Sequence, residues 1–183
     1  MTRSPFALAL LLAAATLPPL LTGCAPVVVA GAAGAALVAT DRRSAGAQLD
    51  DQTIETKIAT TVAGRYGDTV HFNVTSYNGI VLLTGEVPDA AVRADVYALA
   101  RGTDRVRSVH DELVVGPNTD LGARTNDSYV TSKVKTRFVE ASDKFSATQV
   151  KVVTERGVVY LMGLVTRAEG EAAAQIASTT SGV

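Results

Sequence analysis

A nine-residue phrase occurs twice in this chain, as GIVLLTGEV from Gly79 to Val87 and as GVVYLMGLV from Gly157 to Val165. The similarity extends toward the N-terminus, where DQTIETKIATTV (51–62) aligns without a gap with DSYVTSKVKTRF (127–138). An internal repeat of this kind indicates one supersecondary unit used twice. We therefore expect two small modules, each of which gains from a partner because a small core is only marginally stable.

Each copy begins with a predicted amphipathic helix. Its apolar residues recur at positions i, i+4 and i+8, which places them on one helix face. They are Ile54, Ile58 and Val62 in the first copy, and Val130, Val134 and Phe138 in the second. Asp51 and Asp127 stand at the start of these helices, where an N-cap carboxylate accepts hydrogen bonds from first-turn amides. We expect both aspartates to be N-caps.

A β-hairpin is predicted after each of these helices. Asn78-Gly79 is a strong signal for a two-residue hairpin turn, and Gly157 takes the same place in the second copy. Gly85 and Gly163 recur within the strands, which indicates a bulge or a close helix crossing.

A second helix is predicted over 88–102, with Asp89 as its N-cap, and over 166–182 in the second copy. The first copy closes with a strand over 105–115, whereas the second stops at Val183, where this strand should begin. The predicted fold class is α+β: two tandem αββαβ modules, each a small mixed three-stranded sheet packed against two helices. We expect the second module to be incomplete.

The first residues of the chain have the pattern of a bacterial export signal. Arg3 is followed by the apolar stretch FALALLLAAATL, and Pro18-Pro19 interrupts that stretch too early for a membrane span. Leu21-Thr22-Gly23-Cys24 resembles the lipobox of bacterial lipoproteins, which implies covalent diacylglycerol and an N-acyl chain on Cys24. The alternative is an ordinary signal peptide that leaves a free thiol, a liability in an oxidising compartment.

The lipobox resemblance also bears on location. Ala25 follows the cysteine, and the absence of Asp at that position favours the outer membrane over the inner membrane. We expect no cofactor besides the acyl chains. The predicted organisation is a lipoprotein signal peptide (1–23), a lipidated N-terminus and tether (24–50), a first domain (51–115), a linker (116–126) and a second domain (127–183).

The repeated pattern resembles the BON domain, a module of bacterial envelope proteins. The resemblance is carried by Asp-x-x-Ile in the first helix, Val-x-Val in the first strand and Gly-hydrophobic-Val-x-Leu-x-Gly-x-Val in the second. Two such copies behind a lipobox are similar to outer-membrane lipoproteins of this family. The resemblance implies an envelope-integrity protein on the periplasmic side of the outer membrane. It also implies binding of anionic phospholipid, such as phosphatidylglycerol, through the first helix of the second module, and gathering at the division site with envelope or division proteins.

The helix predicted over 128–141 carries the candidate lipid-binding residues: Tyr129, Lys133, Lys135, Thr136, Arg137 and Val139. This chemistry suits a membrane surface, because an aromatic ring seats at the acyl boundary while basic groups meet lipid phosphates. The first module has Thr53, Ala59 and Thr61 at the positions of Tyr129, Lys135 and Arg137, so only the second keeps the pattern. A solvated helix face without a ligand is the alternative.

Catalytic and metal-ligand spacings are missing from the sequence. His71 and His110 stand in predicted strands without a paired carboxylate pattern, so we expect structural or surface roles for both. A formal net charge of −1 argues against nucleic-acid binding. We therefore expect neither an enzyme nor a metal site. The alternative function is an envelope scaffold, in which sheet edges and Tyr77 or Tyr160 bind another protein.

Overall fold

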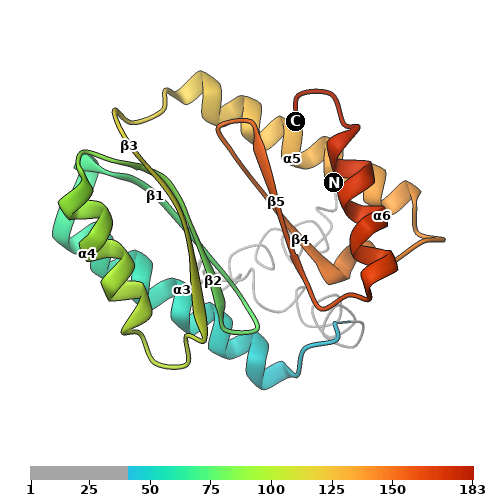
Figure 1. The fold of residues 1–183 in the computed structure, drawn as a ribbon, viewed down its shortest axis with the longest axis horizontal. Coiled ribbons are helices and arrows are strands. Elements are labelled where there is room, and N and C mark those ends of the chain that lie inside the picture. The colour runs from blue at the N-terminus through green and yellow to red at the C-terminus, as the bar shows by residue number, and fades with distance from the viewer. Residues whose placement is uncertain (1–40) are drawn as a thin grey trace, which may run out of the picture. The chain divides into compact units, whose positions relative to one another are not determined.

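The computed structural model describes residues 41–183 (Figure 1). The predicted signal peptide, Cys24 and the tether up to residue 40 lie outside the described residues. The helices and strands in chain order are α3 (Ala45–Tyr66), β1 (His71–Tyr77), β2 (Ile80–Val87), α4 (Ala90–Arg101), β3 (Ser108–Val115), α5 (Leu121–Glu140), β4 (Val150–Glu155), β5 (Val158–Gly163) and α6 (Arg167–Ser178). Short 3-10 turns lie at Gly67–Thr69 and Ala147–Gln149. In the described part of the chain, no helix is both long and apolar enough to cross a membrane.

The first module has the predicted αββαβ order around a mixed sheet. β1 and β2 pair antiparallel, and β3 pairs with β2 in parallel. The helices α3 and α4 pack against this sheet and share its core (Figure 1). The fully buried core residues are Ile54, Ile58, Val62, Val81, Leu83, Val87, Val96, Ala100 and Leu113. Burial of a side chain such as Ile or Leu contributes about 1.5–3 kcal/mol, so the apolar stripe of α3 fixes this helix to the sheet.

The second module is shorter and has a two-stranded sheet. β4 and β5 pair antiparallel, and α5 and α6 pack with this hairpin around a separate core. Phe138 and Phe145 meet there edge to face, with ring centroids 5.0 Å apart and ring planes at 82°. Such a pair contributes about 0.5–1.5 kcal/mol beyond burial of its area. The predicted α+β class is therefore confirmed, with a three-stranded mixed sheet in one module and two strands in the other.

The strand β2 is buried on both faces. Leu82, Thr84 and Glu86 alternate with the core residues of the first module, yet they are only 4%, 1% and 0% exposed. Their face of the sheet is turned toward the second module, to which it is linked by polar contacts. In one of these, the Asn73 amide donates a hydrogen bond of 2.8 Å to the Glu155 carboxylate. The first sheet thus packs against its own helices on one side and the second module on the other.

The prediction that Asp51 and Asp127 are N-caps is wrong. The helices α3 and α5 begin earlier, with Ser44 and Asp120 as the caps that accept first-turn amides. The chain from Leu121 onward, expected to be part of the linker, is therefore helical. These first turns face solvent and carry no apolar stripe, so hydrophobic periodicity did not reveal them.

Other helix ends follow the expected chemistry. The N-cap predicted for α4 is confirmed, since Asp89 accepts a hydrogen bond of 2.9 Å from the Val92 amide. At the start of α6, Thr166 and Glu169 form a capping box in which each side chain accepts from the other residue's backbone amide.

Asp51 holds the hairpin turn of its own module. Its carboxylate accepts hydrogen bonds from the amides of Asn78 and Gly79 at 2.7 and 2.8 Å, and from the Ser76 hydroxyl at 2.6 Å. Asn78 and Gly79 have φ values of 52° and 74°, as a two-residue turn with two positive φ angles requires. Burial alone would raise the pKa of Asp51, but these hydrogen bonds and one from Arg43 outweigh it, so the pKa is lowered from 3.8.

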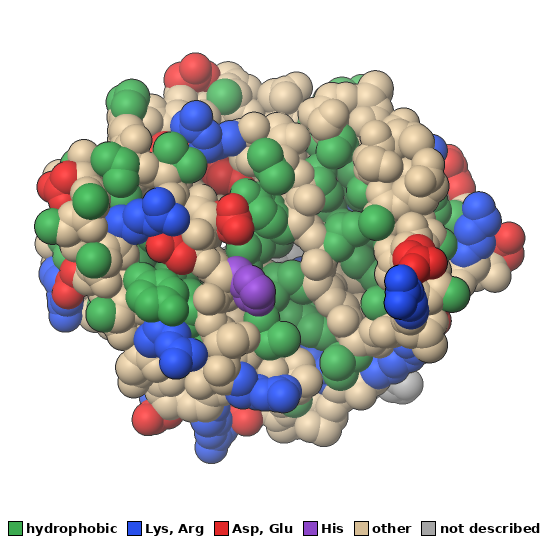
Figure 2. Space-filling view, in the orientation of Figure 1, with side chains coloured by type: hydrophobic (Ala, Val, Ile, Leu, Met, Phe, Trp, Pro, Cys, Tyr) green, Lys and Arg blue, Asp and Glu red, His purple; other side chains and the backbone are tan. Residues whose placement is uncertain are grey.

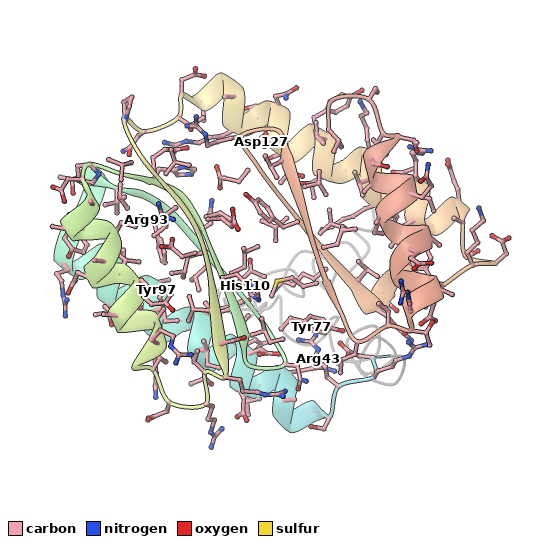
Figure 3. The ribbon with its side chains drawn as sticks, viewed as in Figure 1. Arg43, Tyr77, Arg93, Tyr97, His110 and Asp127 are labelled. Atoms are coloured by element: carbon pink, nitrogen blue, oxygen red, sulfur yellow. The ribbon has the colours of Figure 1, made fainter. Side chains whose placement is uncertain are left out.

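Asp127 does the same in the second copy. Its carboxylate accepts hydrogen bonds from the amides of Arg156 and Gly157 at 2.8 and 2.9 Å, and its position is labelled in Figure 3. Both of these turn residues also have positive φ. The aspartate that recurs in the repeat is therefore a link between the first helix and the hairpin in each module.

Gly85 lies in regular pairing with β1, and its close contact comes from that strand, so the bulge or helix crossing predicted there is not found. Gly85 has φ +116°, and a Cβ added there would lie 2.1 Å from the His71 carbonyl oxygen on β1. Gly163 shows the same crowding in the second hairpin, where an added Cβ would lie 2.5 Å from the Gln149 carbonyl oxygen. Each hairpin thus needs glycine at this point for its strands to pair closely.

We expect Gly85→Ala to lower the free energy of unfolding by about 3 kcal/mol, because the side chain adds both backbone strain and a clash. Gly64→Ala is the matched control, since no atom lies within 4 Å of the added Cβ in α3. We expect it to raise stability by about 0.5–1 kcal/mol. Urea unfolding followed by circular dichroism measures both, and unchanged stability of Gly85→Ala would contradict the strand packing described above.

We expect Asp51→Asn to cost about 1–3 kcal/mol at pH 7, because the amide cannot accept all of the hydrogen bonds made by the carboxylate. Since the folded pKa of Asp51 is lowered, its stabilisation is present above about pH 3.9 and is lost as the pH falls through the folded value. The difference between parent and variant should therefore shrink from pH 7 to about pH 2.5 in urea unfolding. Asp50→Asn, at an exposed ion pair, is the control and should cost less than about 1 kcal/mol.

Candidate functional site

The helix α5 holds all six candidate lipid-binding residues on one rigid element. Its buried stripe of Val130, Val134 and Phe138 is at most 1% exposed and fixes the rotation of the helix about its axis. The six candidate residues therefore lie on the sides of the helix that do not face the core. Lys135, Thr136 and Val139 are exposed, as is Tyr129, whereas Lys133 and Arg137 are half-buried.

Four of the six candidates line one groove between α5 and the end of α6. The groove has a volume of about 490 Å³, and its lining comprises Tyr129, Ser132, Lys133, Thr136, Arg137, Thr179, Thr180 and Ser181. Lys135 and Val139 do not belong to this lining and lie on the exposed surface of the helix. The structure thus brings four candidates together and adds hydroxyl groups from a segment that the sequence did not connect with them.

Two basic side chains of the groove also hold the end of α6. Arg137 donates hydrogen bonds to the Ile176 carbonyl at 2.8 Å and to the Thr180 hydroxyl at 2.7 Å. Lys133 donates to the Ser181 carbonyl and, at 2.6 Å, to the Ser181 hydroxyl. Cations are favourable near the free carbonyls at the C-terminus of a helix. Both side chains therefore have a structural role that spacing along α5 did not indicate.

The cations on this surface have no carboxylate partner. Within residues 41–183, Lys133, Lys135 and Arg137 form no ion pair. In the first module, Lys57 takes the position of Lys133 and lies 3.7 Å from the carboxylate of Asp104. The groove thus offers uncompensated positive charge and hydroxyl donors, which is the chemistry that binds an anion.

Large apolar side chains on α5 face solvent beside this charge. Leu121, Tyr129 and Val139 are 78%, 63% and 63% exposed. The ammonium of Lys133 lies 5.1 Å from the centre of the Tyr129 ring, within the range of a cation–π contact. Leu121 was not among the candidates, because the helix was expected to begin at Ser128. The surface therefore combines positive charge with exposed apolar area.

A second hollow, of about 480 Å³, is lined by residues of β1, β2, β3 and β5. Figure 2 shows apolar side chains gathered in a hollow of the drawn face with a histidine at its edge, and the lining includes His110 and Glu112. Among residues 41–183, no Lys or Arg lines this hollow, so the hollow does not offer the cationic donors that an anion needs. It is suited to apolar groups instead.

Tyr77 is not available as the partner contact that the scaffold alternative expected. It is only 4% exposed, and its hydroxyl donates to the Gln149 carbonyl at 3.2 Å. The guanidinium of Arg43 lies 3.9 Å from its ring centre, and Figure 3 labels both side chains. Tyr160 is half-buried, with its hydroxyl 3.4 Å from the Glu112 carboxylate.

Three side chains that could hold a metal ion meet between the modules, although the sequence predicted no such set. His71 Nδ1 lies 2.9 Å from Glu86 Oε2 and 3.8 Å from Glu155 Oε1. Within residues 41–183, one ligand atom from each lies within 4.8 Å of the others. Burial alone would raise the pKa of Glu86, but hydrogen bonds from Thr119, His71 and Arg156 outweigh it and lower the pKa to about 2.

The first module has the order αββαβ and the second the order αββα. In each, an aspartate on the first helix binds the hairpin turn, and this repeated arrangement defines the class of protein. The chain belongs to the BON-domain family, because the BON domain matches residues 50–117 and 126–183.

Relatives of the whole chain agree with this family. The chain is 42% identical over 186 residues to the outer membrane lipoprotein DolP of Haemophilus influenzae, with 100% of this chain and 94% of the relative covered. It is 34% identical to a 21 kDa hemolysin of Actinobacillus pleuropneumoniae (78% of this chain, 74% of the relative). It is 29% identical to osmotically-inducible protein Y of Escherichia coli (74% of this chain, 69% of the relative).

The predicted resemblance to outer-membrane lipoproteins with two BON domains is confirmed by these matches, and the predicted outer-membrane localisation with it. The family and the name of the Haemophilus relative point to a non-enzymatic protein of the envelope.

Proposed function

We propose that this lipoprotein, anchored through acyl chains on Cys24 on the periplasmic side of the outer membrane, binds anionic phospholipid through α5 of its second BON domain. It would thereby support envelope integrity, including at the division site, together with envelope or division proteins. The observation that carries the proposal is the groove on α5, where cations without carboxylate partners stand beside the exposed ring of Tyr129. Phosphatidylglycerol is the expected lipid, because it presents an anionic phosphate next to acyl chains.

A lipid phosphate would meet Lys133 in the groove. The ammonium now donates to the carbonyl and hydroxyl of Ser181, which are neutral acceptors. An anionic phosphate is a stronger partner than either, because it adds attraction between opposite charges to the hydrogen bond. Lys135 is exposed on the same helix, and a basic residue near an anionic membrane surface contributes about 1 kcal/mol.

The exposed apolar side chains would meet the boundary between headgroups and acyl chains. Tyr129, Val139 and Leu121 lie on the same helix as the basic residues, a combination typical of helices that lie on membrane surfaces. The first module has Thr53 at the position of Tyr129, and its Lys57 is paired with Asp104. We therefore assign the lipid contact to the second module alone.

The proposal predicts selective binding to anionic vesicles. We expect the mature chain from residue 24 with Cys24→Ser, which carries no acyl chains, to co-sediment with vesicles that contain phosphatidylglycerol and not with phosphatidylcholine vesicles. Tyr129→Glu should abolish binding, because it puts a negative charge where the ring meets the membrane. Tyr97→Glu is the matched control: Tyr97 is 39% exposed on α4 of the first module (Figure 3), and its replacement should leave binding unchanged.

Charge and salt separate this function from the scaffold alternative. Binding should weaken in Lys135→Gln and as ionic strength rises, since salt screens the attraction between exposed charges. Equal binding to both vesicle types, or full binding by Tyr129→Glu, would contradict the proposal. Failure to bind either vesicle would leave the acyl anchor as the membrane contact and favour a protein scaffold.

A further inference from the structure

A buried carboxylate between the two modules has no Lys or Arg paired with it among residues 41–183. Glu155 is 5% exposed, and its Oε2 accepts a hydrogen bond of 2.8 Å from the Asn73 amide. Its Oε1 accepts no hydrogen bond from any residue in the range 41–183 and lies 3.8 Å from His71 Nδ1. A buried carboxylate with one neutral donor is costly unless a positive charge compensates it. Within the described residues, His71 is the one basic side chain within ion-pair distance of Glu155.

Glu86 and His71 complete the surroundings of this oxygen. The side chain of Glu86 is 0% exposed, and its Oε2 lies 2.9 Å from the same His71 Nδ1. Arg156 lies 3.3 Å from the other oxygen, Oε1, whereas Oε2 also accepts a hydrogen bond of 2.9 Å from the Thr119 amide. One imidazole nitrogen and two carboxylate oxygens thus converge within 4.8 Å of one another.

We propose that His71, Glu86 and Glu155 form a binding site for a divalent metal ion, with Zn²⁺ as the ion that fits best. Zn²⁺ binds imidazole nitrogen and carboxylate oxygen at about 2.0–2.2 Å, so the ligand atoms of a tetrahedral site lie about 3.3 Å apart. The two separations that involve His71, 2.9 and 3.8 Å, lie on either side of this value, and all three ligand atoms lie within 4.8 Å of one another. An imidazole ligand disfavours Ca²⁺ and Mg²⁺, which take oxygen ligands.

A small cavity beside the cluster has room for a further ligand. Its volume is about 140 Å³, and its lining is polar: His71, Asn73, Arg124, Asp127, Ser128, Thr131, Thr154 and Glu155. A polar cavity of this size can hold water. Three protein ligands with water in the fourth position are a common arrangement for Zn²⁺.

The charges around the site also favour a cation. The carboxylates of Glu86, Glu155 and Asp127 face two guanidinium groups, those of Arg124 and Arg156. Arg124 donates to the Thr119 carbonyl at 2.9 Å, and so does not pair with any of these carboxylates. With His71 left aside as a ligand, the carboxylates outnumber the guanidinium groups, and a divalent ion would compensate the difference.

A metal ion here would join the two modules. His71 lies on β1 and Glu86 on β2 of the first module, whereas Glu155 lies on β4 of the second. The ion finds all three ligands only when both modules are folded and in contact, so its binding should stabilise that arrangement. The metal–ligand bonds would then link the two modules, and removal of the metal would break this link.

The test is titration of Zn²⁺ into the mature chain with Cys24→Ser, after treatment with a chelator. This replacement removes the chain's only thiol, so no cysteine can bind the metal. We expect one Zn²⁺ per chain by isothermal titration calorimetry and a higher thermal unfolding midpoint with Zn²⁺ than without it. Co²⁺ bound in place of Zn²⁺ should show weak visible absorption, as expected for nitrogen and oxygen ligands.

Variants decide whether these residues are the ligands. Glu155→Gln and His71→Gln should each weaken Zn²⁺ binding by at least about 100-fold, because even changes behind the ligands cost 10–100-fold. His110→Ala is the matched control: it removes the chain's other histidine, which is exposed, and should bind Zn²⁺ as the parent does. Absence of Zn²⁺ binding by the parent, or unchanged affinity in folded Glu155→Gln and His71→Gln, would overturn the proposal.

Discussion

Each module depends on a carboxylate that joins its first helix to its hairpin turn. Asp51 and Asp127 occupy equivalent places in the repeat, and each accepts the two backbone amides of the turn that follows. Both turns have positive φ angles, which direct these amides toward one point. Without the carboxylate these amides would lose their partner, which costs about 1–3 kcal/mol where the amide is buried, as at Gly79. The same bonds hold the first helix to its hairpin in the rotation that burial of its apolar stripe also requires.

With the helix fixed in this way, its flank can differ between the copies. In the second copy Lys133 and Arg137 hold the end of α6, and no carboxylate among residues 41–183 pairs with them. In the first copy the equivalent Lys57 is paired with Asp104. One scaffold can therefore carry a surface suited to an anionic membrane in one module and omit it in the other, because the residues that differ contribute little to the core.

The contact between the modules has a different character from either core. Each core is apolar, whereas the shared face of β2 presents Thr84 and Glu86, and Glu86 binds Thr119, His71 and Arg156. Contacts between domains are generally more polar than domain interiors. Buried polar groups here must be matched in pairs, so a few directional bonds help to specify the arrangement of the modules beside the apolar contact of Leu82.

Local patterning was sufficient to predict much of this molecule. The spacing of Ile54, Ile58 and Val62 indicated the core face of α3, Asn78-Gly79 indicated the turn, and the repeat indicated two modules of one family. Helix starts were missed, because turns that face solvent carry no apolar period. The partners of Lys133 and the meeting of His71 with Glu155 were also out of reach, since they join residues far apart in the chain. Only packing brings such residues together, so the tertiary structure decided how the charges of this protein are paired.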